Sequence, residues 1–284
     1  MKMKLFAMVM VTVIVSTCVS CGSGGNPAPL GVSAEPADLF RYEFDAEYNG
    51  IVLTRYSGMK SSVKVPDKID GLPVVGIDDS CFKVGQVTEV YFPDTLKYFK
   101  FGGLLNYATG AKNMETVTIP KGVTEITSDA FCGFSFTSIT IPDSVTIIGS
   151  SAFELCKSLT SITIPNSVTY IDSFAFEACR SLINITISNS VTEIDSYAFK
   201  NCTSLTSITI PDSVITIGNY AFDSCISLTN ITIPNSVTTI GSRAFNDCHS
   251  LTNAIYNGVT YSVITNQFGQ SFLPPEFYNT INGK

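Results

Sequence analysis

Five cysteines recur every 23 residues in the second half of this 284-residue sequence and are the first candidates for chemistry: Cys156, Cys179, Cys202, Cys225 and Cys248. Thiols at a fixed period meet when a chain folds into stacked coils, so neighbouring cysteines would lie within disulfide distance. Five is an odd number, however, and a buried thiol also acts as a compact apolar side chain with a weak hydrogen-bond donor. We therefore predict a reduced thiol column in the core. Cys132 lies outside this column, and the sequence leaves its state open.

The other reactive side chains predict neither a metal site nor a catalytic centre. Outside the N-terminal segment with Cys18 and Cys21, the sequence contains no Cys-x-x-Cys pair, and it has no Cys/His cluster of the kind that zinc sites use. His249 is the only histidine and occupies a variable position, so we expect it at the surface. Asp172 and Asp195 fall at a turn position where a structural role suffices, and no Gly-x-Ser-x-Gly or phosphate loop occurs. We predict a protein that is not an enzyme and takes no cofactor.

The cysteines belong to a repeated phrase, I-x-I-P-[DN]-S-V-T-x-I-x-x-x-A-F-x-x-C-x-S-L-T-[SN]. It begins at five positions, with a 22-residue version at Val117: Ile139, Ile162, Ile185, Ile208 and Ile231. A fixed period of this length is typical of a solenoid, in which each repeat is one coil and neighbouring coils supply the core. Such a chain presents a long repetitive surface, which favours a binding function.

Within one repeat, the apolar pattern predicts three local structures. The Ile-x-Ile pair alternates with period two and predicts a short strand that ends at proline. From Phe153 the apolar spacing becomes three, through Cys156 and Leu159, which predicts a helical or 3₁₀ turn. A column of Gly and Asp predicts a turn with positive φ: Gly149, Asp172, Asp195, Gly218 and Gly241. The strands are expected to form a parallel sheet on the concave side of an arc.

Two sets of outward positions are the candidate binding surfaces. Because the isoleucines of each strand point inward, the residues beside them point outward. They form a lattice of hydroxyls and amides on the expected concave face: Ser138, Thr140, Ser161, Thr163, Asn184, Thr186, Ser207, Thr209, Asn230 and Thr232. Threonine also favours strands for structural reasons alone. Phe174, Tyr197 and Tyr220 share another column and form a possible secondary aromatic strip.

The N-terminus predicts export. Lys2 and Lys4 precede a short apolar run that ends at Val15, and small residues follow up to Cys21. This stretch resembles a bacterial lipoprotein signal, which implies lipid attachment at Cys21; Cys18 is the less suitable alternative. An ordinary cleaved secretory signal is the other interpretation. The Gly-, Ser- and Pro-rich residues that follow predict a flexible tether.

The repeats resemble the BspA-like class of leucine-rich repeats, whose pattern joins L-x-x-I-x-I-P to S-V-x-x-I-x-x-x-A-F-x-x-C. The resemblance is strong over residues 117–253, and Asn49-Gly50 and Asn257-Gly258 predict hairpins on either side. It implies a mainly β leucine-rich-repeat arc, with short parallel strands on the concave face and short helical turns or irregular coils on the convex face. We expect a signal peptide at 1–20, a tether at 21–40, an N-terminal cap with degenerate repeats at 41–116, regular repeats at 117–253 and a C-terminal hairpin cap at 254–284.

The expected function is non-catalytic binding or adhesion at a bacterial cell surface, with the protein held to the membrane by its N-terminal lipid. The resemblance implies binding to host matrix proteins or to other cells. A glycan-binding surface lipoprotein and a structural component without a specific ligand are the alternatives. A net charge of −7 gives no basic patch, so we expect no nucleic-acid partner.

Overall fold

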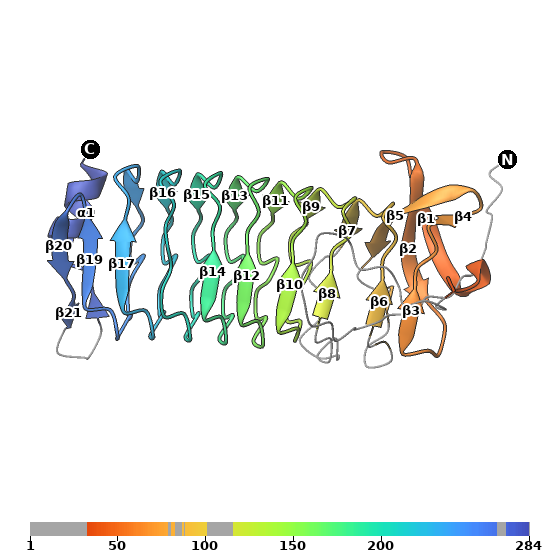
Figure 1. Cartoon of the computed structure of the whole chain (residues 1–284), viewed down its shortest axis with the longest axis horizontal. Coiled ribbons are helices and arrows are strands. Elements are labelled where there is room, and N and C mark those ends of the chain that lie inside the picture. Colours follow the sequence, from red (N-terminus) through yellow and green to blue (C-terminus); the bar gives the residue numbers. More distant parts are fainter. Residues whose placement is uncertain are drawn as a thin grey trace.

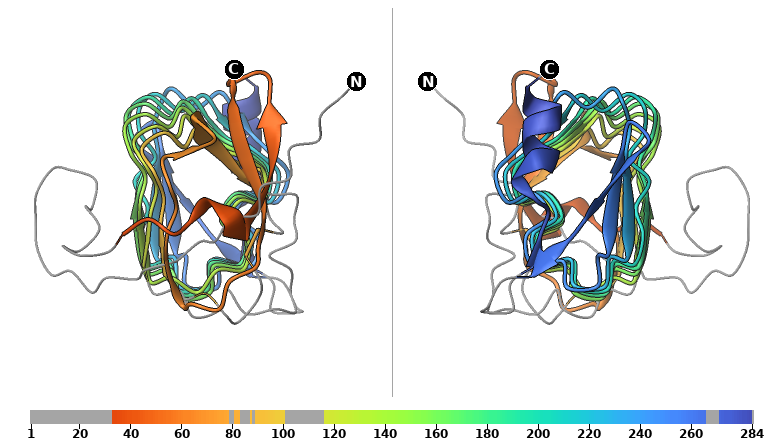
Figure 2. Two further views of the ribbon diagram at one scale, coloured as in Figure 1. Left: turned by 90° about the vertical axis from the view of Figure 1, so that its right-hand side faces the viewer. Right: turned by 90° about the vertical axis from the view of Figure 1, so that its left-hand side faces the viewer.

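The computed structural model describes residues 33–78, 81, 82, 87, 89–100, 116–265 and 271–283. The predicted signal, Cys18, Cys21 and most of the tether lie outside these residues. Figure 1 shows the coils stacked in a line between an N-terminal hairpin and a C-terminal cap. Viewed along the line, successive coils superimpose, so equivalent residues lie above one another (Figure 2). The predicted solenoid is confirmed, and it is almost entirely β-structure and turns.

The Ile-x-Ile segments form the predicted parallel strands on one side of the coils. Four of them pair into one sheet in the order β14-β12-β10-β8. Their bounds are β8 Thr116–Thr118, β10 Ser138–Thr140, β12 Ser161–Thr163 and β14 Asn184–Thr186. Farther along, β17 (Asn230–Ile233) pairs in parallel with β19 (Asn253–Tyr256). Residues 207–210 lie between these two groups in the chain and have the same alternation of exposed and buried side chains.

A second sheet, parallel from β2 onward, runs along another side of the coils and is longer than the first. It joins the N-terminal hairpin to the last regular coil in the order β1-β2-β5-β7-β9-β11-β13-β15-β16-β18. Each regular coil contributes two residues to it, in the stretch that the sequence predicts only as extended. These strands are β9 Glu125–Ile126, β11 Ile147–Ile148, β13 Tyr170–Ile171, β15 Glu193–Ile194, β16 Thr216–Ile217 and β18 Thr239–Ile240.

The N-terminal elements begin the long sheet and form a separate two-stranded sheet. A 3₁₀ turn, η1 (Ala37–Leu39), leads into the antiparallel hairpin of β1 (Phe40–Asp45) and β2 (Gly50–Tyr56), as Asn49-Gly50 predicts. Two strands outside the long sheet, β3 (Ser62–Lys64) and β6 (Glu89–Tyr91), pair in parallel. The remaining strands of this part are β4 Lys68–Ile69, β5 Leu72–Asp78 and β7 Tyr98–Lys100.

The C-terminal elements cover the last coil. β20 (Val259–Ser262) pairs antiparallel with β19, and β21 (Ile264–Thr265) pairs with β22 (Ser271–Phe272). Helix α1 (Pro275–Asn282) packs beside β18. The Asn282 side-chain amide accepts from Ile240 N–H at 2.6 Å and donates to Ile240 C=O at 2.8 Å, so one side chain pairs with the edge strand as a further coil would. In the described part of the chain, no helix is long and apolar enough to cross a membrane.

A column of stacked phenylalanine rings fills the core. Ring centroids are 5.1 Å apart between Phe153 and Phe176 and 5.3 Å apart between Phe176 and Phe199, with nearly parallel planes. The column continues through Phe222 and Phe245, where Phe277 of α1 covers its end in an edge-on contact. Every coil therefore buries its ring against the rings of its neighbours.

The predicted helical turn is realised as a succession of tight turns. Cys156 N–H donates to Phe153 C=O three residues back, which is the 3₁₀ pattern. Alternate N–H groups instead donate to carbonyls of the next coil; Phe153 N–H, for example, donates to Ala175 C=O at 2.7 Å. Left-handed residues make this alternation possible, and Ser151 and Leu155 have φ of 56° and 59°. No helix forms because half of the donors bond to the neighbouring coil.

The prediction of positive φ in the Gly/Asp column is wrong. Positive φ occurs at two other positions of each coil, and Gly149, Gly218 and Gly241 are not among them. Glycine is needed for space instead: a Cβ on Gly218 would lie 2.4 Å from the backbone nitrogen of Ser196. The backbone bond to the preceding coil is 2.8 Å long at Gly218 but 3.1 Å at Asp195. The coils thus approach more closely where the column holds glycine.

Candidate functional site

The ten predicted binding residues form one exposed surface, which we call the polar face: Ser138, Thr140, Ser161, Thr163, Asn184, Thr186, Ser207, Thr209, Asn230 and Thr232. All ten side chains are exposed, and the isoleucines between them are buried. Register places Ser161 opposite Asn184 and Thr163 opposite Thr186. The polar face therefore consists of two straight rows that run along the solenoid, with about 4.8 Å between neighbours in a row.

The hydrogen-bonding groups of the polar face are available to a partner. Asn230 Nδ2 donates to Thr229 Oγ1 at 3.3 Å. The other nine side chains have no hydrogen-bond partner among the described residues. Each hydroxyl offers one donor and two acceptor positions. The face carries no charge and no aromatic ring, so hydrogen bonds and shape are its means of recognition.

The predicted aromatic strip is a continuous stack on the turn side of the coils. Ring centroids of Phe174 and Tyr197 are 4.7 Å apart, and those of Tyr197 and Tyr220 are 5.0 Å apart. All three rings are partly exposed, and all three residues are left-handed, with φ between 55° and 62°. Left-handed backbone is strained for bulky residues, so the contacts between coils hold these side chains in place.

Two cations, Lys200 and Arg243, lie beside the aromatic strip, and the sequence alone did not assign them to it. Arg243 continues the column beyond Tyr220, and its guanidinium carbon lies 5.8 Å from the centre of that ring. Lys200 Nζ lies 5.2 Å from the centre of the Tyr197 ring and 3.9 Å from Glu177 Oε1. Arg243 occupies the column of the strip, and Lys200 follows Tyr197 by three residues; these positions are the signal that identifies the two cations in the sequence.

The cysteine column has the structure that the sequence predicts. All cysteines among the described residues are free thiols, and the five of the column are buried. Each thiol donates to the carbonyl of a phenylalanine in the preceding repeat; Cys179 Sγ, for example, lies 3.0 Å from Phe153 O. Burial raises the pKa of the Cys179, Cys202 and Cys225 thiols well above the ordinary value. These thiols are structural and unreactive in the folded chain.

The carboxylates of the turn column also have structural partners. Asp195 Oδ2 accepts from Tyr170 Oη at 2.7 Å and from Ser173 Oγ at 2.9 Å. Partial burial acts to raise the pKa of Asp195, but these bonds and one from Ser196 N–H outweigh it and lower the pKa. Asp195 therefore stays ionised and fixes the Tyr170 ring. His249 is exposed, as predicted.

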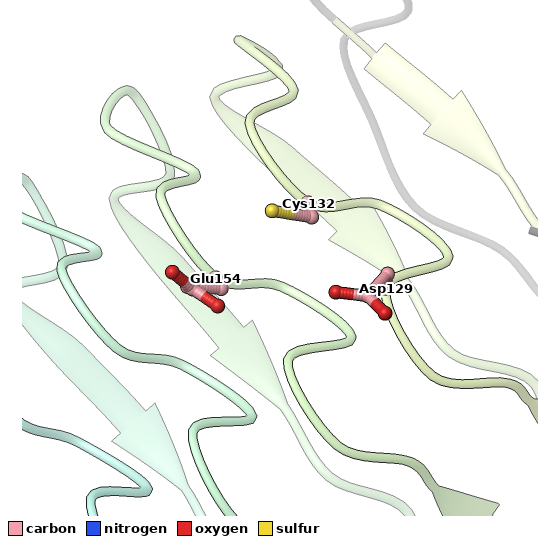
Figure 3. A group of neighbouring side chains, drawn as sticks. All are labelled: Asp129, Cys132 and Glu154. Atoms are coloured by element: carbon pink, nitrogen blue, oxygen red, sulfur yellow. The ribbon is translucent and has the colours of Figure 1, made fainter. Parts of the chain in front are cut away.

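One group of potential metal ligands escaped the sequence analysis because it comes from two coils. Figure 3 shows Asp129 and Cys132 beside Glu154 of the next repeat, with one ligand atom from each within 4.8 Å of the others. Burial, with the nearby Glu154 and Asp129 carboxylates, raises the pKa of Cys132 to about 12. A metal needs the thiolate, which this environment disfavours. All three side chains are partly exposed, and we assign no ion to them.

The parallel coils, the inward isoleucines and the polar face of threonine, serine and asparagine define a leucine-rich-repeat solenoid. The sequence model of the family described as "BspA type Leucine rich repeat region" matches in six copies, over residues 104–214 and 192–273. This match covers more than half of the chain, so the protein belongs to the BspA-type leucine-rich repeat family. Among curated proteins, none matches the chain.

Two solved bacterial leucine-rich repeat proteins, from Bacteroides ovatus and Eubacterium ventriosum, have the same fold. A leucine-rich repeat protein from Bacteroides ovatus is 24% identical, with a TM-score of 0.56, over 78% of this chain and 70% of that one. One from Eubacterium ventriosum is 21% identical, with a TM-score of 0.52, over 82% of this chain and 55% of that one. The T. pallidum leucine-rich repeat protein is 29% identical over 78% of this chain and 71% of that one, with a TM-score of 0.37.

Because the thiols are buried, we expect the folded chain to lose stability at alkaline pH. Burial raises the pKa of Cys248 from about 9 to about 12. The folded chain then keeps a proton that the unfolded chain releases above pH 9, so this contribution to stability is complete below pH 9 and declines as pH rises. Relative to a Cys248→Ala variant, the free energy of unfolding should fall by roughly 1.4 kcal/mol per pH unit above 9. Urea unfolding of both chains between pH 8 and pH 11 measures the difference between their free energies of unfolding. A difference that does not change with pH would contradict the raised pKa of Cys248.

Proposed function

We propose that this protein is a non-catalytic binding protein of a bacterial cell surface, and that it uses the polar face to bind proteins of a host matrix or of other cells. The observation that carries the proposal is the set of exposed side chains on that face whose hydrogen-bonding groups have no partner in the described chain. The face is uncharged, whereas the chain carries a net charge of −7. The face itself therefore neither attracts nor repels a partner by charge.

An extended partner suits the polar face better than a compact one. Each hydroxyl or amide contributes only a weak net hydrogen bond, on the order of 1 kcal/mol. Equivalent groups recur in each coil, so a partner that lies along the solenoid makes many such bonds at once. Because the rows are held by the backbone ladder, little conformational entropy is lost when the partner binds.

A glycan is the second candidate partner, since hydroxyl and amide groups also bind sugar hydroxyls. The face contains no aromatic ring on which a sugar would stack, and this favours a protein. A structural component of the surface without a specific ligand is the third possibility. These three functions differ in what the purified protein binds, so one binding experiment separates them.

We also propose that the chain is exported and anchored in the membrane through lipid on Cys21. The proposal rests on Lys2, Lys4, the apolar run and the small residues before this cysteine. In cells that make the full chain, wild-type protein should fractionate with membranes, and the Cys21→Ser variant should be released. Mass spectrometry of the mature N-terminus then identifies the modified residue. A lipid on Cys18, or an unmodified mature N-terminus, would overturn the assignment to Cys21.

Replacement of Thr163, Thr186 and Thr209 together by Lys should abolish binding through the polar face. The long side chains block one row and add charge to it, so affinity should fall at least about tenfold. The probes are arrays of purified matrix proteins and of glycans, read with the folded domain. Replacement of Thr146, Thr169 and Thr192 by Lys is the matched control, because these threonines are equally exposed beside the second sheet.

The outcomes distinguish the three functions. Binding to matrix proteins that the first variant loses and the control keeps supports the proposal. Signal on glycans alone favours the glycan-binding alternative, and no signal on either array favours a structural component. Equal loss in both variants would place binding elsewhere on the chain.

A further inference from the structure

We propose that the aromatic strip, Phe174, Tyr197 and Tyr220, forms a second contact surface together with Lys200 and Arg243, and that it binds an acidic segment of a protein. This surface goes beyond the proposed function, which places binding on the polar face. The strip and the polar face belong to different parts of each coil: the tyrosines lie in the turns, and the polar face lies on the strands. The two surfaces can therefore be tested separately.

The stacking of the rings argues against a sugar at the strip. Sugars bind aromatic side chains through the flat ring faces. Both faces of Tyr197 are covered, one by Phe174 and one by Tyr220, with planes within 6° of parallel. The second face of Tyr220 is directed towards the Arg243 guanidinium. For Tyr197 and Tyr220, the ring edges and the hydroxyls are therefore the groups that remain for a partner.

The ring edges, the hydroxyls and the two neighbouring cations all offer positive or partly positive groups to a partner. Aromatic ring edges carry partial positive charge, and phenol hydroxyls are hydrogen-bond donors. Arg243 is exposed and adds a fixed positive charge with several donors, and its Nη1 lies 3.4 Å from the Tyr220 hydroxyl. Lys200 adds a second cation beside Tyr197. A partner that presents carboxylates satisfies all of these groups.

The acidic side chains near the strip are less accessible than its cations. The Glu177 side chain, which pairs with Lys200, is 18% exposed, against 29% for Lys200 itself. Asp223 is buried, and its Oδ1 accepts from Asn246 Nδ2 at 2.8 Å. Asp195 accepts bonds from Tyr170 and Ser173. Asp195 and Asp223 therefore bond to groups other than the two cations, whereas Glu177 pairs with Lys200. Arg243 forms no ion pair within the described residues and is the cation left to face an acidic segment.

The strip is also fixed before any partner arrives. Its residues hold left-handed backbone conformations that a bulky side chain adopts only under constraint, and each ring is clamped by its neighbours. Tyrosine and arginine in rigid positions are the residues that dominate the energetics of protein contacts. Binding then costs little side-chain entropy.

The test measures the fluorescence anisotropy of two labelled synthetic peptides, one alternating Glu with Ser and one alternating Gln with Ser. The Glu peptide should bind the wild-type chain at least about tenfold more tightly than the Gln peptide. A Lys200→Gln, Arg243→Gln variant should lose this difference. A Lys157→Gln, Arg180→Gln variant is the matched control, because it removes the same amount of charge at two exposed cations outside the strip. This control should still bind the Glu peptide more tightly than the Gln peptide.

Two further variants separate the strip from general charge attraction and from the polar face. Tyr197→Ala removes the central ring and should weaken binding of the Glu peptide at least about fivefold. Replacement of Thr163, Thr186 and Thr209 by Ala should leave that binding unchanged even if the polar face has no ligand. Equal binding of the two peptides, or equal losses in the two charge variants, would overturn the proposal, as would strip-dependent self-association in place of peptide binding.

Discussion

Contact between successive coils is the interaction on which the rest of this structure depends. No single coil encloses its own core: each phenylalanine ring packs on the rings of the coils before and after it. Backbone groups follow the same rule, because Phe153, Phe176 and Phe199 each donate to an alanine carbonyl one repeat later. The thiols donate in the opposite direction, to the preceding repeat. Stability therefore accumulates from one interface to the next.

This dependence divides the residues of a repeat into two groups. Those that touch the neighbouring coil are nearly invariant from repeat to repeat, and they account for the fold. Those that face solvent are not fixed by the core, although one row of the polar face is threonine in every regular repeat, and they give each side of the solenoid its own chemistry. One side is uncharged and rich in hydroxyls, whereas the turn side carries stacked rings and cations. The proposed contacts lie on these two surfaces because the core leaves their composition open.

The period of the sequence was sufficient to predict the solenoid, the Ile-x-Ile strands and the buried thiols, because each follows from the spacing of apolar residues. It did not reveal that two-residue stretches such as Ile147–Ile148 build the longer sheet, since two residues are too few for a periodic pattern. Nor did it place positive φ at Ser151 and Tyr197, where bonds to the next coil outweigh residue preference. The Asp129, Cys132 and Glu154 group was missed because stacking, not sequence spacing, brings it together.

Deletion of one whole repeat tests the account most directly. Removal of residues 185–207, which is one 23-residue period, joins Asn184 to Ile208 and keeps every column in register. The shortened chain should fold and unfold cooperatively, with the β-rich circular dichroism spectrum of the parent and a smaller denaturant dependence, because one coil interface fewer is exposed. Removal of residues 185–196 breaks the columns and should abolish cooperative unfolding. If the whole-period deletion failed to fold, or if both deletions behaved alike, column-by-column stacking would not be what holds the chain together.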